Sequence, residues 1–324
     1  MSAGMQAYAD ELAARLPLVA PEMRFVTLRR DRTLTLDEHI GLPLRLRATH
    51  ARLFHFLSVY APLFAPRPYV VTIHDLIHLR FPAQFKATVG PYYRTVVRTV
   101  CARAARVITD DERTVGDFER FLGVAPSKVR VIPLGVGADF LEGPEPAPRQ
   151  GGRPYFLYVG NHRPHKDLPT LFEAWQALPS DLDADLVLTG PDDLGAAGRP
   201  RRRIGALRFA GDVGVAGLRD LYAGALALVS PSLCEGFGLP LLEAAAVGTP
   251  VIASKEALPG TLRPFAEAFT PRDVRSLVEL MSRAARSPGR REEARRFART
   301  QTWDLCAKRT AEVYQEVLAE IESR

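Results

Sequence analysis

The sequence predicts an α/β protein of two Rossmann-like domains, each built around a parallel sheet. Short runs of β-branched residues alternate with longer helical patterns along nearly the whole chain, an order typical of βαβ units. Prolines and glycines interrupt the alternation at 143–152, after which it restarts. We therefore expect an N-terminal domain at 1–142, a linker at 143–152, a C-terminal domain at 153–302 and a closing helix in 303–324.

Before the linker, β-branched and aromatic runs predict strands, and a 3.6-residue periodicity predicts helices. The expected strands are Arg24–Leu28, Leu53–Leu57, Tyr69–Ile73, Arg106–Thr109 and Val129–Pro133. The expected helices are Met5–Leu16, Asp37–Ala48 and Gly90–Ala105. The last of these places arginines on one face and valines on another, as an amphipathic surface helix does.

After the linker the same pattern is denser and more regular. The expected strands are Tyr155–Val159, Ala184–Thr189, Leu207–Ala210, Ala225–Ser230 and Pro250–Ala253. The expected helices are Leu168–Ala177, Ala216–Ala223, Leu239–Val247, Val274–Arg286, Arg291–Arg299 and Leu305–Ile321. Alternation of this kind predicts a second parallel sheet covered by helices on both faces.

Composition limits the class of protein. The hydrophobic fraction of 47% and the charged fraction of 25% are those of a soluble globular chain, and no apolar run approaches the ~20 residues that span a bilayer. The first residues lack the basic-then-apolar order of a signal peptide, so we expect a cytoplasmic location. Three widely spaced cysteines form no metal or disulfide pattern, and Cys234 is expected to be a buried, inert side chain.

The net charge of +6 would favour a polyanionic partner, but solvated arginine-rich helix faces are the preferred explanation. No basic stretch is interleaved with aromatic residues, so we expect no nucleic-acid partner. The basic helix predicted at Gly90–Arg106 makes peripheral contact with an anionic membrane a hypothesis.

The strongest chemical signal is the segment Pro231–Ala244, which contains Glu235 and Glu243. A predicted buried strand leads into a loop with Gly236 and Gly238, and a helix begins near Leu239. Glycines let a backbone approach a ligand, and a helix N-terminus binds anions, so the segment suits a diphosphate. Glu235 would accept hydrogen bonds from sugar hydroxyls, and Glu243, one turn into the helix, would face a ribose diol. The alternative, an exposed Glu243 beside an ordinary loop, does not explain a carboxylate within an apolar helix.

A second signal lies at Tyr155–Leu168, where a predicted strand ends at Gly160. Arg163 and Lys166 follow in the loop, at the carboxyl end of a parallel strand, where open α/β sheets bind ligands. There they would neutralise charge that develops on a leaving nucleoside diphosphate. Solvated cations are the alternative, stronger for Arg163 than for Lys166. Asp167 is placed to cap the helix that follows.

A third signal is His74 and Asp75, which stand where the predicted strand Tyr69–Ile73 leaves the sheet. A neutral His74 could hydrogen-bond a sugar hydroxyl, or it could be structural. His74 and His78 are four residues apart, which raises a zinc site, but the segment begins as a strand and no third ligand is in view. No dinucleotide or P-loop glycine motif is present, and Pro191–Asp193 is expected to be a turn. We therefore expect neither a cofactor nor a metal.

These motifs resemble those of the family 4 glycosyltransferases, which have the GT-B fold. The pair Glu235 and Glu243 resembles the two-glutamate signature of that family, and the loop 160–166 resembles its diphosphate loop. The segment Leu207–Val213 resembles the one that lines the nucleobase, and His74 falls where the family places a histidine near donor sugar and acceptor. Trp303 and Asp304 precede a last helix that, in the family, crosses back to the N-terminal domain.

The resemblance implies a retaining glycosyltransferase that moves a hexose from a nucleoside-diphosphate sugar to a hydroxyl-bearing acceptor. Two domains would face each other across a cleft, and the leaving phosphate would help to deprotonate the acceptor by front-face attack without metal. Catalytic roles would fall to His74, Arg163, Lys166 and Glu235. Donor-binding roles would fall to Gly160, Val213, Gly236, Phe237, Gly238, Leu239 and Glu243, and acceptor-side roles to Gly4 and Asp75.

One departure from the family concerns the start of the chain. Relatives begin with a strand and a glycine-rich loop before the first helix, whereas here only Gly4 precedes the helix predicted at Met5–Leu16. We therefore expect the first strand to be missing from the N-terminal sheet, and the true start of the protein to lie upstream of Met1 or the sheet to close in another way.

Two other functions remain open at this stage. A sugar-nucleotide epimerase of similar fold would need acid and base groups facing the donor sugar, and the C-terminal domain offers few histidines for that. A non-catalytic partner that only binds nucleotide sugars would not need Lys166, Glu235 and Glu243 to be intact. Donor hydrolysis by the purified chain would separate these alternatives.

Overall fold

The computed structural model describes residues 3–28, 39–141, 152–195, 199–200, 205–287 and 291–323. The chain divides into two compact units. Unit 1 comprises Met1–Gly135 with Thr302–Arg324, and unit 2 comprises Val136–Gln301. Apart from Gly152, the segment expected to be a linker lies outside the described residues.

Unit 1 contains a four-stranded parallel sheet in the order β1-β2-β3-β4. Its strands are β1 (Phe54–Phe56), β2 (Tyr69–Thr72), β3 (Arg106–Thr109) and β4 (Val129–Val131). Since all four are parallel, their carboxyl ends lie along one edge, where the residues that follow β2 and β3 become neighbours. Within the described residues β1 is the first strand along the chain.

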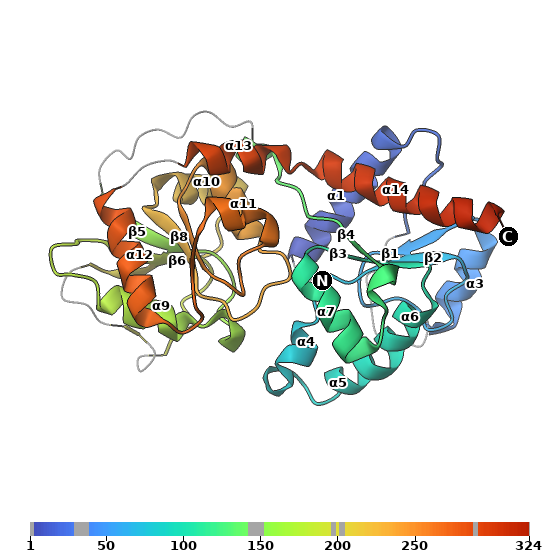
Figure 1. Ribbon diagram of the computed structural model, residues 1–324, viewed down its shortest axis with the longest axis horizontal. Coiled ribbons are helices and arrows are strands. Elements are labelled where there is room, and N and C mark those ends of the chain that lie inside the picture. The colour runs from blue at the N-terminus through green and yellow to red at the C-terminus, as the bar shows by residue number, and fades with distance from the viewer. Residues whose placement is uncertain are drawn as a thin grey trace. The chain divides into compact units, whose positions relative to one another are not determined.

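Helical segments cover the two faces of this sheet (Figure 1). The helices are α1 (Ala3–Val19), α3 (Gly41–Ala48), α4 (Ile77–Arg80), α5 (Val89–Tyr92), α6 (Arg98–Arg103), α7 (Glu112–Asp117) and α14 (Trp303–Glu322), with π-helical turns at Tyr93–Val97 and Phe118–Leu122. Along β2 the side chains alternate in direction. Tyr69 and Val71 enter the core formed with α6 and the π-helical turns, whereas Thr72 bonds Tyr8 of α1.

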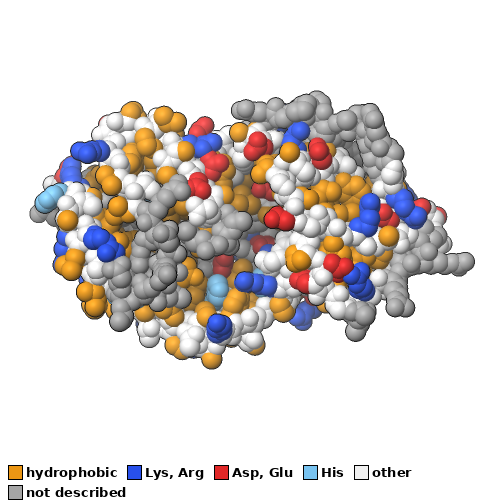
Figure 2. Space-filling view, turned by 180° about the vertical axis from the view of Figure 1, so that it is seen from behind, with side chains coloured by type: hydrophobic (Ala, Val, Ile, Leu, Met, Phe, Trp, Pro, Cys, Tyr) orange, Lys and Arg blue, Asp and Glu red, His pale blue; other side chains and the backbone are white. Residues whose placement is uncertain are grey.

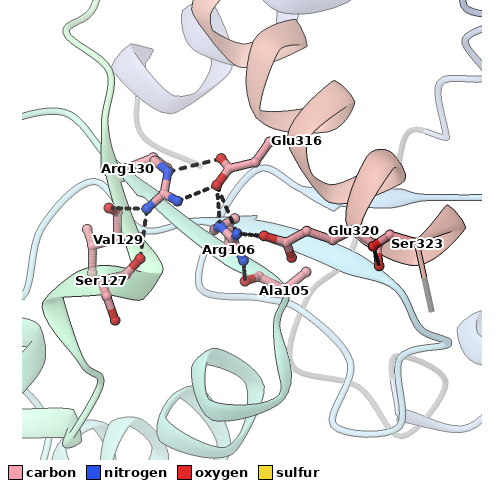
Figure 3. Close-up of polar contacts among 8 residues, drawn as sticks. All are labelled: Ala105, Arg106, Ser127, Val129, Arg130, Glu316, Glu320 and Ser323. Carbon is pink, nitrogen blue, oxygen red and sulfur yellow. Dashed lines mark hydrogen bonds and ion pairs between the residues drawn. The ribbon is translucent and has the colours of Figure 1, made fainter.

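Helix α14, the last element of the chain, packs alongside α1 and is fastened to the sheet by a four-residue ionic network (Figure 3). Glu316 accepts hydrogen bonds from the guanidinium groups of Arg106 on β3, at 2.8 Å, and Arg130 on β4, at 3.0 Å. Glu320 adds a second carboxylate to Arg106. The C-terminal helix therefore packs with the N-terminal sheet as part of unit 1.

Unit 2 contains a six-stranded parallel sheet in the order β10-β9-β8-β5-β6-β7. The strands are β5 (Tyr155–Tyr158), β6 (Asp185–Leu188), β7 (Leu207–Phe209), β8 (Ala227–Ser230), β9 (Val251–Ser254) and β10 (Glu267–Phe269). The chain builds outward from β5 on one side and then from β8 on the other, so the strand order reverses between β5 and β8. A reversal of this kind opens a crevice at the carboxyl ends of the two strands, which is where open α/β sheets bind ligands.

The helices of unit 2 are α8 (Ala138–Leu141), α9 (Leu168–Gln176), α10 (Val215–Gly224), α11 (Leu239–Val247), α12 (Val274–Arg286) and α13 (Glu292–Thr300). On one face α9 and α12 pack side by side over the main core, where Trp175 and Met281 meet Phe156 of β5 (Figure 1). Helix α11 packs with α10, α8 and α13. The short helix α8, upstream of the expected linker, is thus part of unit 2.

The structure departs from several local expectations. Residues 24–28 form no strand, although they are described. The helix expected at Gly90–Ala105 is present as one helical stretch, in which α5 continues through the π-helical turn Tyr93–Val97 into α6. Helix α7 with its following π-helical turn was not expected, and neither was β10, whose three residues are too short for a periodic signal.

On the face shown in Figure 2, lysine and arginine side chains are interspersed with acidic and apolar ones. No helix of the described residues is both long enough and apolar enough to cross a membrane.

Candidate functional site

The central loops of unit 2 follow β5 and β8, the two strands at the reversal of strand order. The loop after β5 carries Arg163 and Lys166, and the loop after β8 carries Glu235. A backbone hydrogen bond of 2.8 Å from the Leu233 N–H to the His165 carbonyl ties the two loops together. The fold therefore brings together side chains that are 69 residues apart.

Lys166 and Glu235 form the ionic centre of this site. The Lys166 Nζ lies 2.7 Å from each carboxylate oxygen of Glu235, and the two side chains are only 12% and 16% exposed. Ser232, which is fully buried, donates a third hydrogen bond of 2.7 Å to Oε1 of Glu235. The backbone carbonyl of Ser232 in turn accepts from the Ser254 hydroxyl on β9. Glu235 is therefore held in one orientation by groups from the two loops, one of which is the cation Lys166.

The first turn of α11 adjoins this pair and has the features of an anion site. Its N-cap is Gly238, whose φ of +93° is a left-handed conformation that favours glycine. A Cβ there would lie 3.2 Å from Leu241. No side chain caps this terminus, so the positive end of the helix is not neutralised. Phe237 is buried, and Gly236 and Leu239 are half-buried.

Glu243, one turn along α11, does not lie on a free helix face. Its carboxylate accepts a 2.9 Å hydrogen bond from the hydroxyl of Tyr222, a buried residue of α10. Burial raises the pKa of Glu243 to about 7, and the hydrogen bond from Tyr222 only partly opposes this. The carboxyl is therefore poised to change charge near neutral pH. Val213, expected near the nucleobase, is half-buried in the loop before α10.

The rest of the loop after β5 is only partly as expected. Gly160 has a φ of +152°, and its N–H donates to Thr189 Oγ1 at 3.2 Å. Arg163 is exposed, and its backbone N–H donates to Asn161 Oδ1 at 3.3 Å. Asp167 is the N-cap residue of α9, but its carboxylate accepts no backbone N–H of that helix. It has a left-handed φ of +52°, and its carboxylate accepts from the Thr170 hydroxyl at 2.7 Å instead.

In unit 1, His74 forms a histidine–carboxylate pair at the carboxyl edge of the sheet. Its Nδ1 lies 2.8 Å from Asp110 Oδ2, where Asp110 directly follows β3 and is 2% exposed. Tyr8 of α1 meets the imidazole edge-on at a centroid distance of 4.7 Å. Burial lowers the pKa of His74, but the charge and hydrogen bond of Asp110 outweigh it and raise the pKa overall. Nε2, the other ring nitrogen, is covered from solvent. None of the described residues bonds it within ordinary hydrogen-bond geometry, although the Leu57 backbone contributes to the raised pKa of His74.

A pocket of about 310 Å³ opens beside this pair, and its lining belongs wholly to unit 1. It is lined by Met5, Ser58, Val59, Tyr60, His74, Asp75, His78, Thr88, Val89, Tyr92 and Tyr93. Asp75 Oδ1 also accepts a 3.0 Å hydrogen bond from the Ile77 N–H. Gly4, expected in an acceptor loop, is helical in the first turn of α1, next to the lining residue Met5.

The zinc alternative finds no support in the geometry. His78 Nδ1 bonds the Tyr93 hydroxyl at 3.0 Å, and its ring packs on those of Phe85 and Tyr93. Among the described residues, no group of three or more His, Cys, Asp or Glu side chains could hold a metal ion. Cys234, the residue before Glu235, is buried. Cys101 and Cys306, elsewhere in the chain, are also buried.

Sequence reasoning missed the two residues that hold the expected ones in place, Asp110 and Ser232. Asp110 follows directly on a correctly predicted strand, so the rule that drew attention to His74 would also have found it. Ser232 lay inside the segment already singled out, but nothing in the sequence indicates that its hydroxyl turns back to Glu235.

Comparison with known proteins gives the family. A model described as Glycosyltransferase Family 4 matches residues 5–140, and one described as Glycosyl transferases group 1 matches residues 141–301. The O-antigen chain mannosyltransferase B of Escherichia coli is 28% identical and aligns with 93% of this chain and 81% of that protein. A D-inositol 3-phosphate glycosyltransferase of Streptomyces scabiei is 31% identical over 70% of this chain. The chain covers 57% of that protein, little more than half its length.

Solved structures agree in fold. Anabaena Alr3699/HepE in complex with UDP and glucose superposes with a TM-score of 0.70 at 16% identity, covering 97% of this chain and 96% of that one. WaaG, a glycosyltransferase involved in lipopolysaccharide biosynthesis, gives 0.65 at 18% identity, covering 96% and 95%. At this identity the likeness shows the GT-B fold alone. With the family models and the mannosyltransferase relative, it establishes that the chain belongs to the family 4 glycosyltransferases and is a hexosyltransferase that uses a nucleotide-sugar donor.

Proposed function

We propose that this protein transfers a hexose, with retention of anomeric configuration and without a metal ion, from a nucleoside-diphosphate sugar to a hydroxyl group of an acceptor. Unit 2 binds the donor and unit 1 binds the acceptor. The observation that carries the donor assignment is the buried Lys166–Glu235 pair at the reversal of strand order, next to the uncapped N-terminus of α11.

The donor's diphosphate is an anion that has to be bound where positive charge is available. The first turn of α11 and Arg163, which is exposed on the loop after β5, supply it. Lys166, whose charge is balanced by Glu235 in the structure, adds to it once Glu235 bonds the hydroxyls of the transferred sugar. Glu235, held by Ser232, accepts hydrogen bonds from hydroxyls of the transferred sugar. Glu243 accepts from the ribose diol once it is ionised, in competition with Tyr222.

In the transfer step the acceptor oxygen forms a bond to the anomeric carbon while the bond from that carbon to the diphosphate oxygen breaks. The acceptor proton passes to the departing phosphate, so a nucleoside diphosphate leaves and no other reactant is consumed. Negative charge grows on the phosphate as the bond breaks. Lys166, Arg163 and the α11 dipole stabilise that charge, the contribution that a metal makes in other transferases. On the acceptor side, His74, which lines the pocket of unit 1, helps to position the attacking hydroxyl.

The acceptor is not carried over from relatives. Their names include chain mannosyltransferases and D-inositol 3-phosphate glycosyltransferases, which differ in the molecule that they glycosylate. A role in polysaccharide assembly and a cytoplasmic location, with peripheral contact to an anionic membrane, are part of the proposal. Liposome co-sedimentation that shows no dependence on anionic lipid would remove the membrane contact.

Release of nucleoside diphosphate from a panel of nucleotide sugars tests the donor site. We expect one donor to be hydrolysed slowly by the wild-type chain, and Lys166→Ala and Glu235→Ala each to lower the rate by about 10²–10³-fold. Arg275→Ala, which removes an exposed cation on α12, is the matched control and should keep the wild-type rate. Hydrolysis that survives both site variants would refute the assignment.

A further inference from the structure

The pocket beside His74 has an unusual charge balance for a protein with 43 lysines and arginines. None of its eleven lining residues, all of them described, is a lysine or an arginine. Asp75 is the one carboxylate of the lining, and Asp110 lies directly behind His74. The pocket therefore offers an incoming anion no permanent cation.

The two histidines of the lining do not change this balance. His78 is engaged through Nδ1 with the Tyr93 hydroxyl and is enclosed by the rings of Tyr93 and Phe85. His74, when protonated, is paired with Asp110 at 2.8 Å, so its charge is already compensated. A positive imidazole at His74 therefore leaves the pair neutral.

The remaining lining provides flat apolar surface edged with hydroxyl groups. Tyr60, Tyr92 and Tyr93 supply aromatic rings, and Ser58 and Thr88 supply short hydroxyl side chains. The Tyr92 hydroxyl donates to the Val59 carbonyl at 3.1 Å, which fixes that ring. Aromatic faces with a few placed polar groups suit a ligand that is apolar on its faces and polar at its edge, as a pyranose is. The volume of about 310 Å³ is at the small end of ligand pockets and suits one sugar ring.

We propose that this pocket selects an uncharged monosaccharide unit as the acceptor terminus and discriminates against the phosphorylated form of the same sugar. The proposal rests on the proposed function, because it names the acceptor class of that transfer. The sugar would pack beside the imidazole of His74, which belongs to the lining. A phosphate monoester carries a charge of about −1.5 to −2 at neutral pH and would enter next to Asp75 with no cation to pair with.

Matched pairs of sugars test the selection on the full chain. Mannose, glucose, galactose and myo-inositol are each compared with a monophosphate of the same compound, and dissociation constants are measured by saturation-transfer NMR. In the pair that binds best, the neutral sugar should bind at least about tenfold more tightly, a difference that one uncompensated charge readily produces. Equal or tighter binding of the phosphate overturns the proposal. So does failure of every neutral sugar to bind at tens of millimolar.

A charge-insertion variant ties the effect to this pocket. Thr88 is an exposed lining residue that makes no side-chain cap to α5, so Thr88→Arg adds a cation at the rim with little structural cost. We expect the preference for the neutral sugar to fall by about tenfold. Ala102→Arg, on the exposed face of α6 and outside the lining, adds the same charge and should leave the ratio unchanged. An unchanged ratio in Thr88→Arg would show that the phosphate does not enter here.

The donor site provides the independent readout. A nucleotide sugar that raises the thermal stability of the same sample shows that the proposed function holds, whatever the acceptor result. Loss of that shift would count against the proposed function, whereas a normal shift with a preference for phosphorylated sugars would count against the acceptor class alone.

Discussion

The two units place their chemistry at the same position in the fold but prepare it for opposite kinds of ligand. In both, the candidate residues follow adjacent parallel strands, at the edge where the carboxyl ends meet. In unit 2 that edge presents Lys166, Arg163 and the positive end of α11. In unit 1 it presents His74, paired with the buried Asp110, and Asp75.

In the proposed function, this difference would match the difference between a charged donor and an uncharged acceptor. Unit 2 would bind the diphosphate with cationic side chains and a helix terminus. Unit 1 would bind a sugar hydroxyl beside a carboxylate-supported imidazole. One fold repeated twice is therefore specialised through a few residues at the strand ends.

The largest expected effect comes from separating the members of the ionic pair in unit 2. Lys166→Met and Glu235→Gln should each reduce donor turnover by about 10²–10³-fold, because each removes charge or hydrogen bonding aimed at the reacting sugar phosphate. The Lys166→Met/Glu235→Gln double variant should be little worse than the poorer single one, since the residues act as a unit. Initial rates of nucleoside diphosphate release, measured for the wild type, both single variants and the double variant, complete the double-mutant cycle.

Additive losses in that cycle would contradict a shared role. Ser232→Ala sharpens the same comparison, because it removes the hydrogen bond that orients Glu235 without changing any charge. We expect an intermediate loss of about tenfold, in the range of one charge-assisted hydrogen bond. A loss as large as that of Glu235→Gln would mean that the orientation, not the carboxylate itself, is limiting.

The second prediction concerns pH and follows from Glu243. Burial raises the pKa of this carboxyl to about 7 from an ordinary value of 4.5, so the folded protein holds a proton that the unfolded chain releases. The stability contribution is fully present below about pH 4.5 and is lost as the pH rises through about 7. Glu243→Gln should therefore be more stable than the wild type at pH 8, by up to about 3 kcal/mol, and equal to it near pH 4.

Denaturant unfolding at several pH values measures this difference, with donor affinity as a second readout. The wild type should bind the nucleotide sugar more tightly as Glu243 ionises, whereas the glutamine variant should show weaker binding with a flatter dependence on pH. A variant whose stability runs parallel to that of the wild type from pH 4 to 8 would place the titration elsewhere.

Asp110→Asn changes the carboxylate that supports the candidate residue of unit 1. Its effect on transfer should be smaller than that of the changes at Lys166 and Glu235. The amide oxygen can still accept from the Nδ1 of His74, but the negative charge that raises the pKa of His74 is gone, and burial then lowers that pKa. We expect acceptor-dependent transfer to fall about tenfold, with its acid limb moved to lower pH, because neutral His74 persists to lower pH. Donor hydrolysis should remain at the wild-type rate, and a parallel loss of hydrolysis would show that Asp110 is merely structural.

The strand ends were the most predictable part of the molecule. His74, Lys166 and Glu235 were found because β-branched runs stop just before them and because parallel strands gather their carboxyl ends at one edge. Their partners were harder to find. The contact of Ser232 with Glu235 depends on how a loop turns. The contact of Tyr222 with Glu243 depends on how α10 packs on α11. Sequence periodicity predicts neither.

Irregular backbone conformation was the second kind of feature that the sequence did not predict. Tyr93–Val97 forms a π-helical turn, although the residue types of this stretch are those of an ordinary α-helix. Strand β10 has three residues and is recognised only through its pairing with β9. Gly4 was expected in a loop by analogy with relatives, whereas it is helical here.

The smallest expected effect compares the ionic network of α14 with an ordinary surface pair. Glu316 bonds two arginines on adjacent strands and is partly shielded, at 34% exposure. The Arg275–Glu279 pair on α12 is far more exposed, at 92% and 67%. Networks of partly buried charges stabilise more than isolated surface pairs, which contribute about 0.3–0.5 kcal/mol within a helix.

We therefore expect Glu316→Gln to lower the free energy of unfolding of the full chain by about 1 kcal/mol, because two guanidinium groups lose their shared carboxylate. Glu279→Gln should lower it by no more than about 0.5 kcal/mol. Urea unfolding at low and high salt separates the two, since screening weakens the exposed pair more than the shielded network. If both variants lose the same small amount, with the same salt dependence, α14 is held by its apolar contacts with α1 rather than by the charges drawn in Figure 3.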